Sequence, residues 1–185
     1  MTKVFISGSM GIKHLDSNVI ARINNIIHSK YQVIVGDASG VDSSIQQHLD
    51  SQQTESVRVY CSGSNARNNI GHWKTEVIKT DAPSGTRAFF TAKDVKMADD
   101  CDYGLMVWDT RSIGTLSNAI ELLNRQKISL IYINKAKEFL KIKEGADLEK
   151  LVSYMSESSF NKADKKLKLR SKIEGFKYQQ GSIEL

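Results

Sequence analysis

The sequence predicts an α/β protein with an open, doubly wound, mainly parallel five-stranded sheet, helices on both of its faces, and a C-terminal helical extension. Short apolar runs alternate with segments of helical spacing between residues 3 and 134. The apolar runs are nearly continuous, which is typical of strands buried on both faces of a parallel sheet. Right-handed crossovers then place helices on both sides of that sheet.

The first half of the chain supplies three strands and two helices. Lys3–Gly8 and Tyr31–Gly36 are β-rich runs that end in glycine, so each is predicted to be a strand. Ser17–Lys30 and Gly40–Gln53 carry apolar residues at helical spacing and are predicted to be helices. Ser56–Gly63 is the third predicted strand.

A polar insert, residues 62–86, follows and contains the only proline of the chain. A loop of this length in a compact domain is a lid, a partner surface or a disordered stretch, and the sequence leaves these three alternatives open. Arg67, His72 and Trp73 in this insert give it cationic and aromatic groups that can close over a ligand.

The second half continues the same alternation. We expect a helix at about Thr91–Ala98, a strand at Tyr103–Asp109, a helix at Leu116–Arg125 and a strand at Ile128–Asn134. These elements complete a main domain at residues 1–157, in which 137–142 is a short strand or hairpin arm and 146–155 a helix. Residues 158–185 form a basic C-terminal segment, either a helix or a solvated tail.

Composition narrows the classes of protein to consider. The 185 residues are 40% hydrophobic and 25% charged, as in ordinary globular domains, and no apolar run approaches the roughly 20 residues of a membrane helix. The N-terminal residues lack the pattern of a signal peptide, so we expect a cytoplasmic protein without a membrane partner. Cys61 and Cys101 have no metal-type spacing and are expected to be reduced thiols, and no histidine pair is spaced as metal ligands. We therefore predict no metal. Much of the net charge of +5 falls in the C-terminal segment.

Three glycine-bearing loops, residues 8–11, 36–42 and 109–115, follow predicted strands. Loops at the carboxyl ends of parallel strands meet at one edge of the sheet, and the helices that start there offer N–H groups and partial positive charge to a ligand. Taken singly, each loop has an alternative role in turn geometry or helix capping. The loops match neither the GxGxxG fingerprint nor the P-loop.

These loops carry a resemblance to a known superfamily. Ser7-Gly8-Ser9, then "GDASGVD" at 36–42, then "TAKDVKMADDCDYGLMVWDTRSIGT" at 91–115 resemble in order the blocks of the SLOG superfamily. This Rossmann-like group links the SMF/DprA proteins to the LOG phosphoribohydrolases, and the match is nearest to its small "RD..M...aD..l.iWd..S.GT" type. The resemblance implies binding of a nucleoside monophosphate, an NAD molecule or an ADP-ribose-like molecule, and a homodimer.

The predicted ligand-binding residues follow from these loops and from the resemblance. Met97 is interpreted as a core residue, whereas Trp108 is either a core residue or a base-stacking one. The expected ligand-binding residues are Gly8, Ser9, Gly36, Asp37, Ser39, Gly40, Asp42, Lys93, Asp109, Ser112, Gly114, Thr115 and Asn118.

Two departures from the enzymes of this superfamily limit the functional prediction. The glutamate of their GTxxE motif is Asn118 here, and an amide cannot act as a nucleophile or general base. Lys93 stands where LOG enzymes have an arginine and lacks its bidentate fork. The main hypothesis is therefore a sensor or sequestering module for a nucleotide-derived ligand. The alternatives are an N-glycosidic hydrolase or transferase using Glu121, Asp109 or Asp94, and a single-stranded nucleic-acid binder like DprA.

Overall fold

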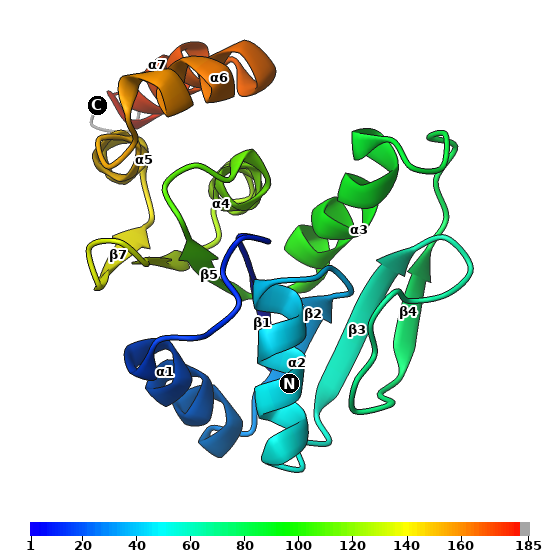
Figure 1. The fold of residues 1–185 in the computed structure, drawn as a ribbon. Helices are drawn as coiled ribbons and strands as arrows, with labels where there is room; N and C mark the ends of the chain where they lie inside the picture. The colour runs from blue at the N-terminus through cyan, green and yellow to red at the C-terminus, as the bar shows by residue number, and fades with distance from the viewer. Residues whose placement is uncertain (182–185) are drawn as a thin grey trace.

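The computed structural model of the protein describes residues 1–181 and contains one seven-stranded sheet (Figure 1). The strand order is β4-β3-β2-β1-β5-β6-β7, and every neighbouring pair is parallel except β6 and β7. The doubly wound α/β prediction is therefore confirmed. The strands are β1 (Lys3–Gly8), β2 (Gln32–Gly36), β3 (Val57–Ser62), β4 (Thr75–Ile78), β5 (Tyr103–Trp108), β6 (Ser129–Ile133) and β7 (Glu138–Ile142).

The sheet has two more strands than predicted, and both lie at its edges. β4 falls inside the polar insert, where four residues of mixed polarity and partial exposure give little strand signal. β7 turns back from β6 in antiparallel register, with Ile131 opposite Leu140. The sequence predicts residues 137–142 as a short strand or hairpin arm and does not include them in the five-stranded sheet. Edge strands are half-solvated, so their residues lack the continuous apolar character that identified the central strands.

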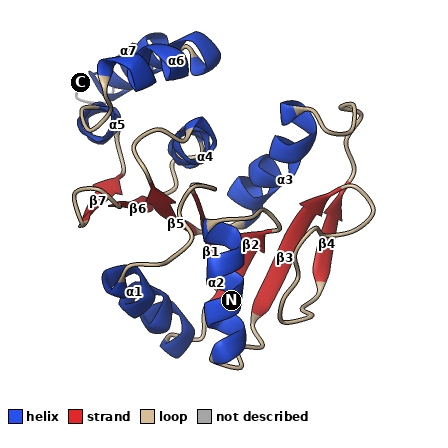
Figure 2. Ribbon diagram, in the orientation of Figure 1, coloured by secondary structure: helices blue, strands red, loops and turns tan. Residues whose placement is uncertain are grey.

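Helices cover both faces of the sheet (Figure 2). On one face, α1 (Ser17–His28) and α2 (Val41–Ser51) pack through residues such as Ile23 and Leu49 against Val33 and Val35. On the other face, α3 (Arg87–Asp100) and α4 (Ile113–Asn124) pack against Phe5, Ile34 and Met106. The buried interior therefore consists of two apolar clusters separated by the sheet.

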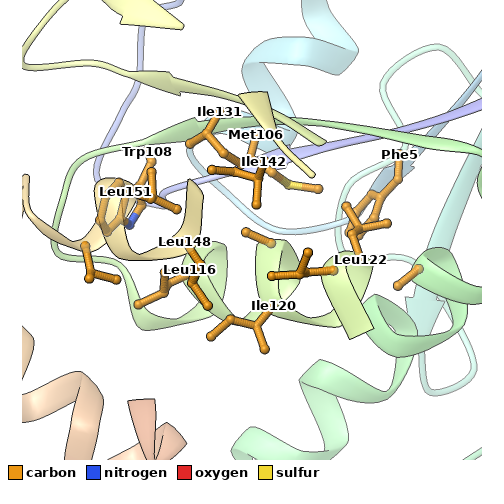
Figure 3. Packing of buried hydrophobic residues seen from close by; sticks show 14 of the residues in the cluster. Phe5, Met106, Trp108, Leu116, Ile120, Leu122, Ile131, Ile142, Leu148 and Leu151 are labelled. Carbon is orange, nitrogen blue, oxygen red and sulfur yellow. The ribbon is translucent and has the colours of Figure 1, made fainter. Parts of the chain in front are cut away.

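The chain after β7 adds three helices to the second of these clusters. They are α5 (Gly145–Val152), α6 (Glu157–Leu167) and α7 (Leu169–Gly181). Leu148 and Leu151 of α5 lie in the same cluster as Leu116 of α4 (Figure 3). Residues 182–185 of the predicted basic segment lie outside the described residues. None of the described helices is long and apolar enough to cross a membrane.

The chain changes direction in the sheet between β1 and β5. From β1 it proceeds outward through β2 and β3 to β4, and it then returns so that β5 lies on the opposite side of β1. In an open α/β sheet, the loops that leave two such strands diverge and form a crevice at the carboxyl edge, which is where ligands bind. The loops after β1 and β5 are two of the three glycine-bearing loops for which the sequence predicts ligand binding.

Candidate functional site

A cavity of about 360 Å³ opens at this carboxyl edge. Its walls come from the loops after β1 and β2, from the insert, from α3 and from the start of α4. We call it the main pocket. It is lined by Ser7, Gly8, Met10, Ala38, Asp42, Arg67, Arg87, Phe90, Thr91, Lys93, Asp94, Ser112, Gly114, Thr115 and Asn118.

Close backbone approach shapes the floor of the main pocket. A Cβ on Gly8 would lie 2.3 Å from the carbonyl oxygen of Val107, so only glycine fits there. The N–H of Ser9 donates to the same carbonyl (2.9 Å), and the Ser9 hydroxyl accepts a hydrogen bond from the N–H of Asp109 (3.0 Å). Ser9 is fully buried and holds the two diverging loops together rather than lining the cavity.

The loop after β2 is joined to the loop after β1 in a similar way. Gly40 has φ +81°, a conformation that L side chains rarely adopt, and a Cβ there would lie 2.4 Å from the carbonyl oxygen of Met10. The N–H of Val41 donates to the carbonyl of Ser9 (3.4 Å). Gly40 is therefore required by packing beneath the pocket, while Ser39 beside it is exposed and does not line the cavity.

The N-terminus of α4 faces the pocket through Gly114 and Thr115. Ser112 is the N-cap, and its hydroxyl accepts hydrogen bonds from the Thr115 N–H (3.4 Å) and from the Thr115 hydroxyl (3.0 Å). The indole N–H of Trp108 donates to the Ser112 carbonyl (3.0 Å). Trp108 is 1% exposed, so it is a core residue that supports this turn and not a base-stacking one. Helix N-termini of this kind attract anions.

Asn118, one turn further along α4, is tied to β1. Its amide N–H donates to the Ser7 hydroxyl (3.1 Å), and that hydroxyl donates to the Met106 sulfur (3.0 Å). Asn118 is buried and still lines the pocket. An amide, and not a carboxylate, therefore occupies this part of the pocket wall.

A cluster of ionisable side chains forms another part of the wall. The Lys93 ammonium, 4% exposed, donates to Asp94 (2.7 Å) and lies 4.0 Å from Asp37. Burial raises the pKa of Asp42 to about 6, although Lys93 opposes this shift. Burial alone would lower the pKa of Lys93, but Asp94 and Asp42 hold it above its ordinary value. Gly36 makes room for the cluster, because a Cβ there would lie 2.4 Å from an Asp42 oxygen and 2.5 Å from the ammonium.

Arg67 and Phe90 form the outer rim. Arg67 donates to Asp37 through Nε (3.0 Å) and Nη2 (2.7 Å), and its guanidinium lies 4.5 Å from the centroid of the Phe90 ring. Burial raises the pKa of Asp37, but the bonds from Arg67 and the charge of Lys93 more than offset this and leave the pKa below its ordinary value. The guanidinium thus covers one face of the Phe90 ring, and a flat ring can stack on the outer face of this planar cation or on the other face of the phenyl ring.

The structure thus brings some of the predicted residues to the pocket and places others behind its walls. Those that line it are Gly8, Asp42, Lys93, Ser112, Gly114, Thr115 and Asn118, whereas Ser9, Gly36, Asp37, Ser39, Gly40 and Asp109 do not. Arg87, Phe90 and Thr91 also line the pocket and were not among the expected residues. Arg87 and Phe90 precede the predicted start of this helix at about Thr91, whereas α3 starts at Arg87.

The three carboxylates considered for catalysis lie in different places. Asp94 lines the pocket and is paired with Lys93. Glu121 is paired with Arg125 and lies outside the pocket lining. Asp109 accepts hydrogen bonds from the N–H groups of Arg111 (2.9 Å) and Ser112 (2.7 Å), so it stabilises its own loop. Within residues 1–181, no group of three His, Cys, Asp or Glu side chains could hold a metal ion.

Comparison with known proteins adds evidence on the fold. No family model matches the chain, and no curated protein matches it. Among solved structures, the fold is similar to that of DNA processing protein A from Helicobacter pylori, a protein with a single-stranded DNA binding mode. The TM-score is 0.57 and the identity 18%, over 90% of this chain and 80% of that one. The chain therefore has a fold like that of DNA processing protein A, in agreement with the resemblance of its loops to the SMF/DprA–LOG group.

Proposed function

We propose that this protein binds a nucleotide unit in the main pocket. The observation that carries the proposal is the position of this pocket, a cavity of about 360 Å³ at the switch point of the sheet, between the N-terminus of α4 and a buried ammonium. The switch point is the common ligand site of open α/β sheets. The chemistry of the walls indicates which part of a nucleotide each wall contacts.

The phosphate fits the inner end of the pocket. The N-terminus of α4 at Gly114 and Thr115 provides backbone N–H groups and partial positive charge. Lys93 has three N–H donors, of which Asp94 takes one, so the ammonium can also bind a phosphate oxygen. The base fits the rim, where it can stack against Phe90 and Arg67.

A second candidate for the source of this nucleotide unit is single-stranded nucleic acid. The similarity in fold to DNA processing protein A favours it over a free nucleotide-derived ligand such as NAD. The rim of the pocket also favours it, since the exposed Arg87 is suited to a phosphate backbone that continues beyond the cavity. In either case we propose binding without turnover, because Asn118 cannot replace a catalytic carboxylate.

Filling the pocket with a side chain tests the proposal. A Cβ on Gly114 would have no neighbour closer than the Ser112 hydroxyl at 4.0 Å, so Gly114→Val extends into the cavity without a clash. Gly175→Val is the matched control, because Gly175 lies on α7 and no atom of the described part of the chain lies within 4 Å of its Cβ position. We expect calorimetry with thymidine and adenosine 5′-monophosphates to show binding by the wild type and the control and at least tenfold weaker binding by Gly114→Val.

Two outcomes would overturn the proposal: equal binding by Gly114→Val and the control, or no nucleotide binding by the wild type. The source of the nucleotide is tested separately with a single-stranded oligonucleotide across a salt series. If the strand is the ligand, log affinity falls with log salt by about 0.7 for each phosphate contacted. Mass spectrometry of the natively purified and then denatured protein identifies a co-purified small molecule instead.

A further inference from the structure

A second cavity, of about 480 Å³, lies at the same edge of the sheet on the far side of the loop after β5. The main pocket does not include its residues. It is lined by Asp109, Thr110, Arg111, Asn134, Lys135, Tyr154 and Ser156. The loop 109–115 lines both cavities, since its first three residues face the second cavity and Ser112, Gly114 and Thr115 face the main pocket.

The loop between the two cavities is held in place by its own hydrogen bonds. Asp109 accepts from the N–H groups of Arg111 and Ser112, and Trp108 donates to the Ser112 carbonyl. Thr110 has φ +65°, which is a strained conformation for a β-branched residue, and it is buried. The loop is therefore a ridge, held by its own hydrogen bonds, with a cavity on each side.

The second cavity has unpaired positive charge. Arg111 and Lys135 are exposed, and neither side chain forms an ion pair with another residue in the part of the chain that the structure describes. In the main pocket, by contrast, the charges of Lys93 and Arg67 are largely met by carboxylates. Two free cations at one cavity are suited to the diffuse charge of a phosphodiester.

The remaining lining residues are suited to the rest of a nucleotide. Tyr154 is half-buried, and its hydroxyl is bound to Glu138, so its ring is held at the cavity wall. An aromatic ring fixed in this way can stack with a base. Asn134 is also held, because its backbone N–H donates to the Trp108 carbonyl (2.9 Å), and its side-chain amide can donate to and accept from a base edge.

We propose that the second cavity binds the neighbouring nucleotide of a single strand whose first nucleotide occupies the main pocket. This inference rests on the proposed function and names the class of its ligand. The strand crosses the ridge at Ser112. Beyond the ridge, Arg111 and Lys135 bind the phosphodiester, and Tyr154 stacks with the second base. A mononucleotide occupies only the main pocket and does not contact the second cavity.

The test compares ligands of one and of two or more nucleotides. The probes are thymidine 5′-monophosphate, the dinucleotide pTpT, a ten-residue oligothymidylate and NAD, whose two units are joined 5′ to 5′. Arg111→Gln/Lys135→Gln is compared with Lys165→Gln/Lys166→Gln, which removes the same charge from exposed positions of α6. Far-ultraviolet circular dichroism and thermal unfolding show that both double variants are folded.

We expect Arg111→Gln/Lys135→Gln to bind pTpT and the oligothymidylate about tenfold more weakly, with a salt slope smaller by about 0.7 for each phosphate that the variant no longer neutralises. Its affinity for thymidine 5′-monophosphate stays within twofold of the wild type, and the α6 variant binds both ligands as the wild type does. Tyr154→Ala weakens pTpT binding and not mononucleotide binding.

The inference is overturned if the Arg111/Lys135 variant binds pTpT as the wild type does, or if the α6 variant weakens pTpT equally. It is also overturned if NAD, and not pTpT, loses affinity in the Arg111/Lys135 variant. Failure of the proposed function differs from all three, because it appears as absent binding of thymidine 5′-monophosphate by the wild type.

Discussion

Arg67 forms a bidentate salt bridge with Asp37, and this pair joins the polar insert to the end of β2. The guanidinium donates to both carboxylate oxygens, and the backbone N–H of Arg67 donates to one of them as well (3.0 Å). The Asp37 side chain is 1% exposed and that of Arg67 is 42% exposed. The insert therefore contributes a structural bond to the site as well as a wall of the pocket.

Removing the hydrogen bonds between the Arg67 guanidinium and Asp37 is expected to destabilise the protein. Arg67→Ala leaves the buried Asp37 carboxylate with Lys93 at 4.0 Å as its nearest cation, and we expect a loss of about 2 kcal/mol in the free energy of unfolding. Arg67→Lys keeps the positive charge but cannot form the bidentate hydrogen bond, so its free energy of unfolding is expected to lie between those of the wild type and Arg67→Ala. Arg87→Ala, at an exposed rim position, is the control and should change stability by less than about 0.5 kcal/mol.

The same pair gives a pH dependence of known sign. Because the pKa of Asp37 is lowered in the folded protein, its contribution to stability is present above about pH 4 and is lost as the pH falls through the folded-state value. Urea titrations at pH 7 and pH 3 measure it. The difference between wild type and Arg67→Ala should shrink at pH 3, and a difference that stays constant would contradict the role assigned to this pair.

The insert is expected to have one rigid and one more dynamic half. Gln46, which is fully buried, bonds the carbonyl of Asn68 (3.2 Å) and the N–H of Ile70 (2.9 Å), and the indole of Trp73 donates to the Thr54 carbonyl (2.7 Å). Residues 79–86 are mostly exposed. We predict slower hydrogen exchange at 67–73 than at 79–86, and slower exchange at 79–86 when an oligonucleotide is bound. Equal protection of the two halves would contradict the lid hypothesis for the second half.

The central elements of the fold could be predicted because their apolar patterns are local. β1, β2, β3, β5 and β6 lie within the predicted strands, since each is mostly buried and, apart from Arg58 in β3, has a largely apolar centre. β4 could not be predicted, because its stability comes from pairing with β3 and its own four residues are only partly buried. The start of α3 was placed too late because exposed Arg87 and Ala88 carry no periodic signal, although Thr86 caps them.

The residues of the candidate site could be predicted only where they lie in a loop that directly follows a strand and carries the polar groups itself. Ser112, Gly114 and Thr115 follow a strand directly, so the topology alone brings them to the pocket. Phe90 and Arg67 are brought together by the packing of α3 and the insert, which no local pattern encodes. The pKa of Asp42 likewise depends on burial in the folded chain and on the charge of Lys93, 51 positions further along the sequence.

Asp42 is expected to make nucleic-acid binding depend on pH. Burial raises the pKa of Asp42 to about 6, so its carboxylate is mainly ionised at pH 7.5 and mainly neutral at pH 5. A negative charge on this wall opposes a bound phosphodiester, and we expect about tenfold tighter binding of an oligothymidylate without terminal phosphate at pH 5 than at pH 7.5. Among residues 1–181, no histidine lines the main pocket, so histidine titration there does not account for this change.

Asp42→Asn is the variant that isolates this effect. The amide oxygen can keep the bond from the Ala38 N–H (3.4 Å) while the charge is removed. Binding should then be nearly independent of pH between 5 and 7.5. The raised pKa also means that the stabilising contribution of Asp42 is present below about pH 4 and is lost as the pH rises through about 6. Asp42→Asn should therefore gain stability relative to the wild type at pH 8 and not at pH 4. An unchanged pH profile in this variant would assign the titration to another group.

The last prediction concerns Asn118 and the absence of turnover. The Asn118 amide, which corresponds to the LOG glutamate in the resemblance of the sequence, donates to Ser7, so we expect the wild type to release no base from nucleoside 5′-monophosphates. General acid–base catalysis typically supplies about 100- to 10,000-fold in rate, and Asn118→Glu should therefore show base release at least about 100-fold above the wild-type level.

Glu121→Ala is the control, because Glu121 is paired with Arg125 outside the pocket lining. Adding Gly114→Val to Asn118→Glu should abolish the new activity, since the added side chain fills the pocket that the substrate must enter. Robust base release by the wild type that is lost in Glu121→Ala would contradict this account, because it would place the catalytic carboxylate one helical turn beyond Asn118.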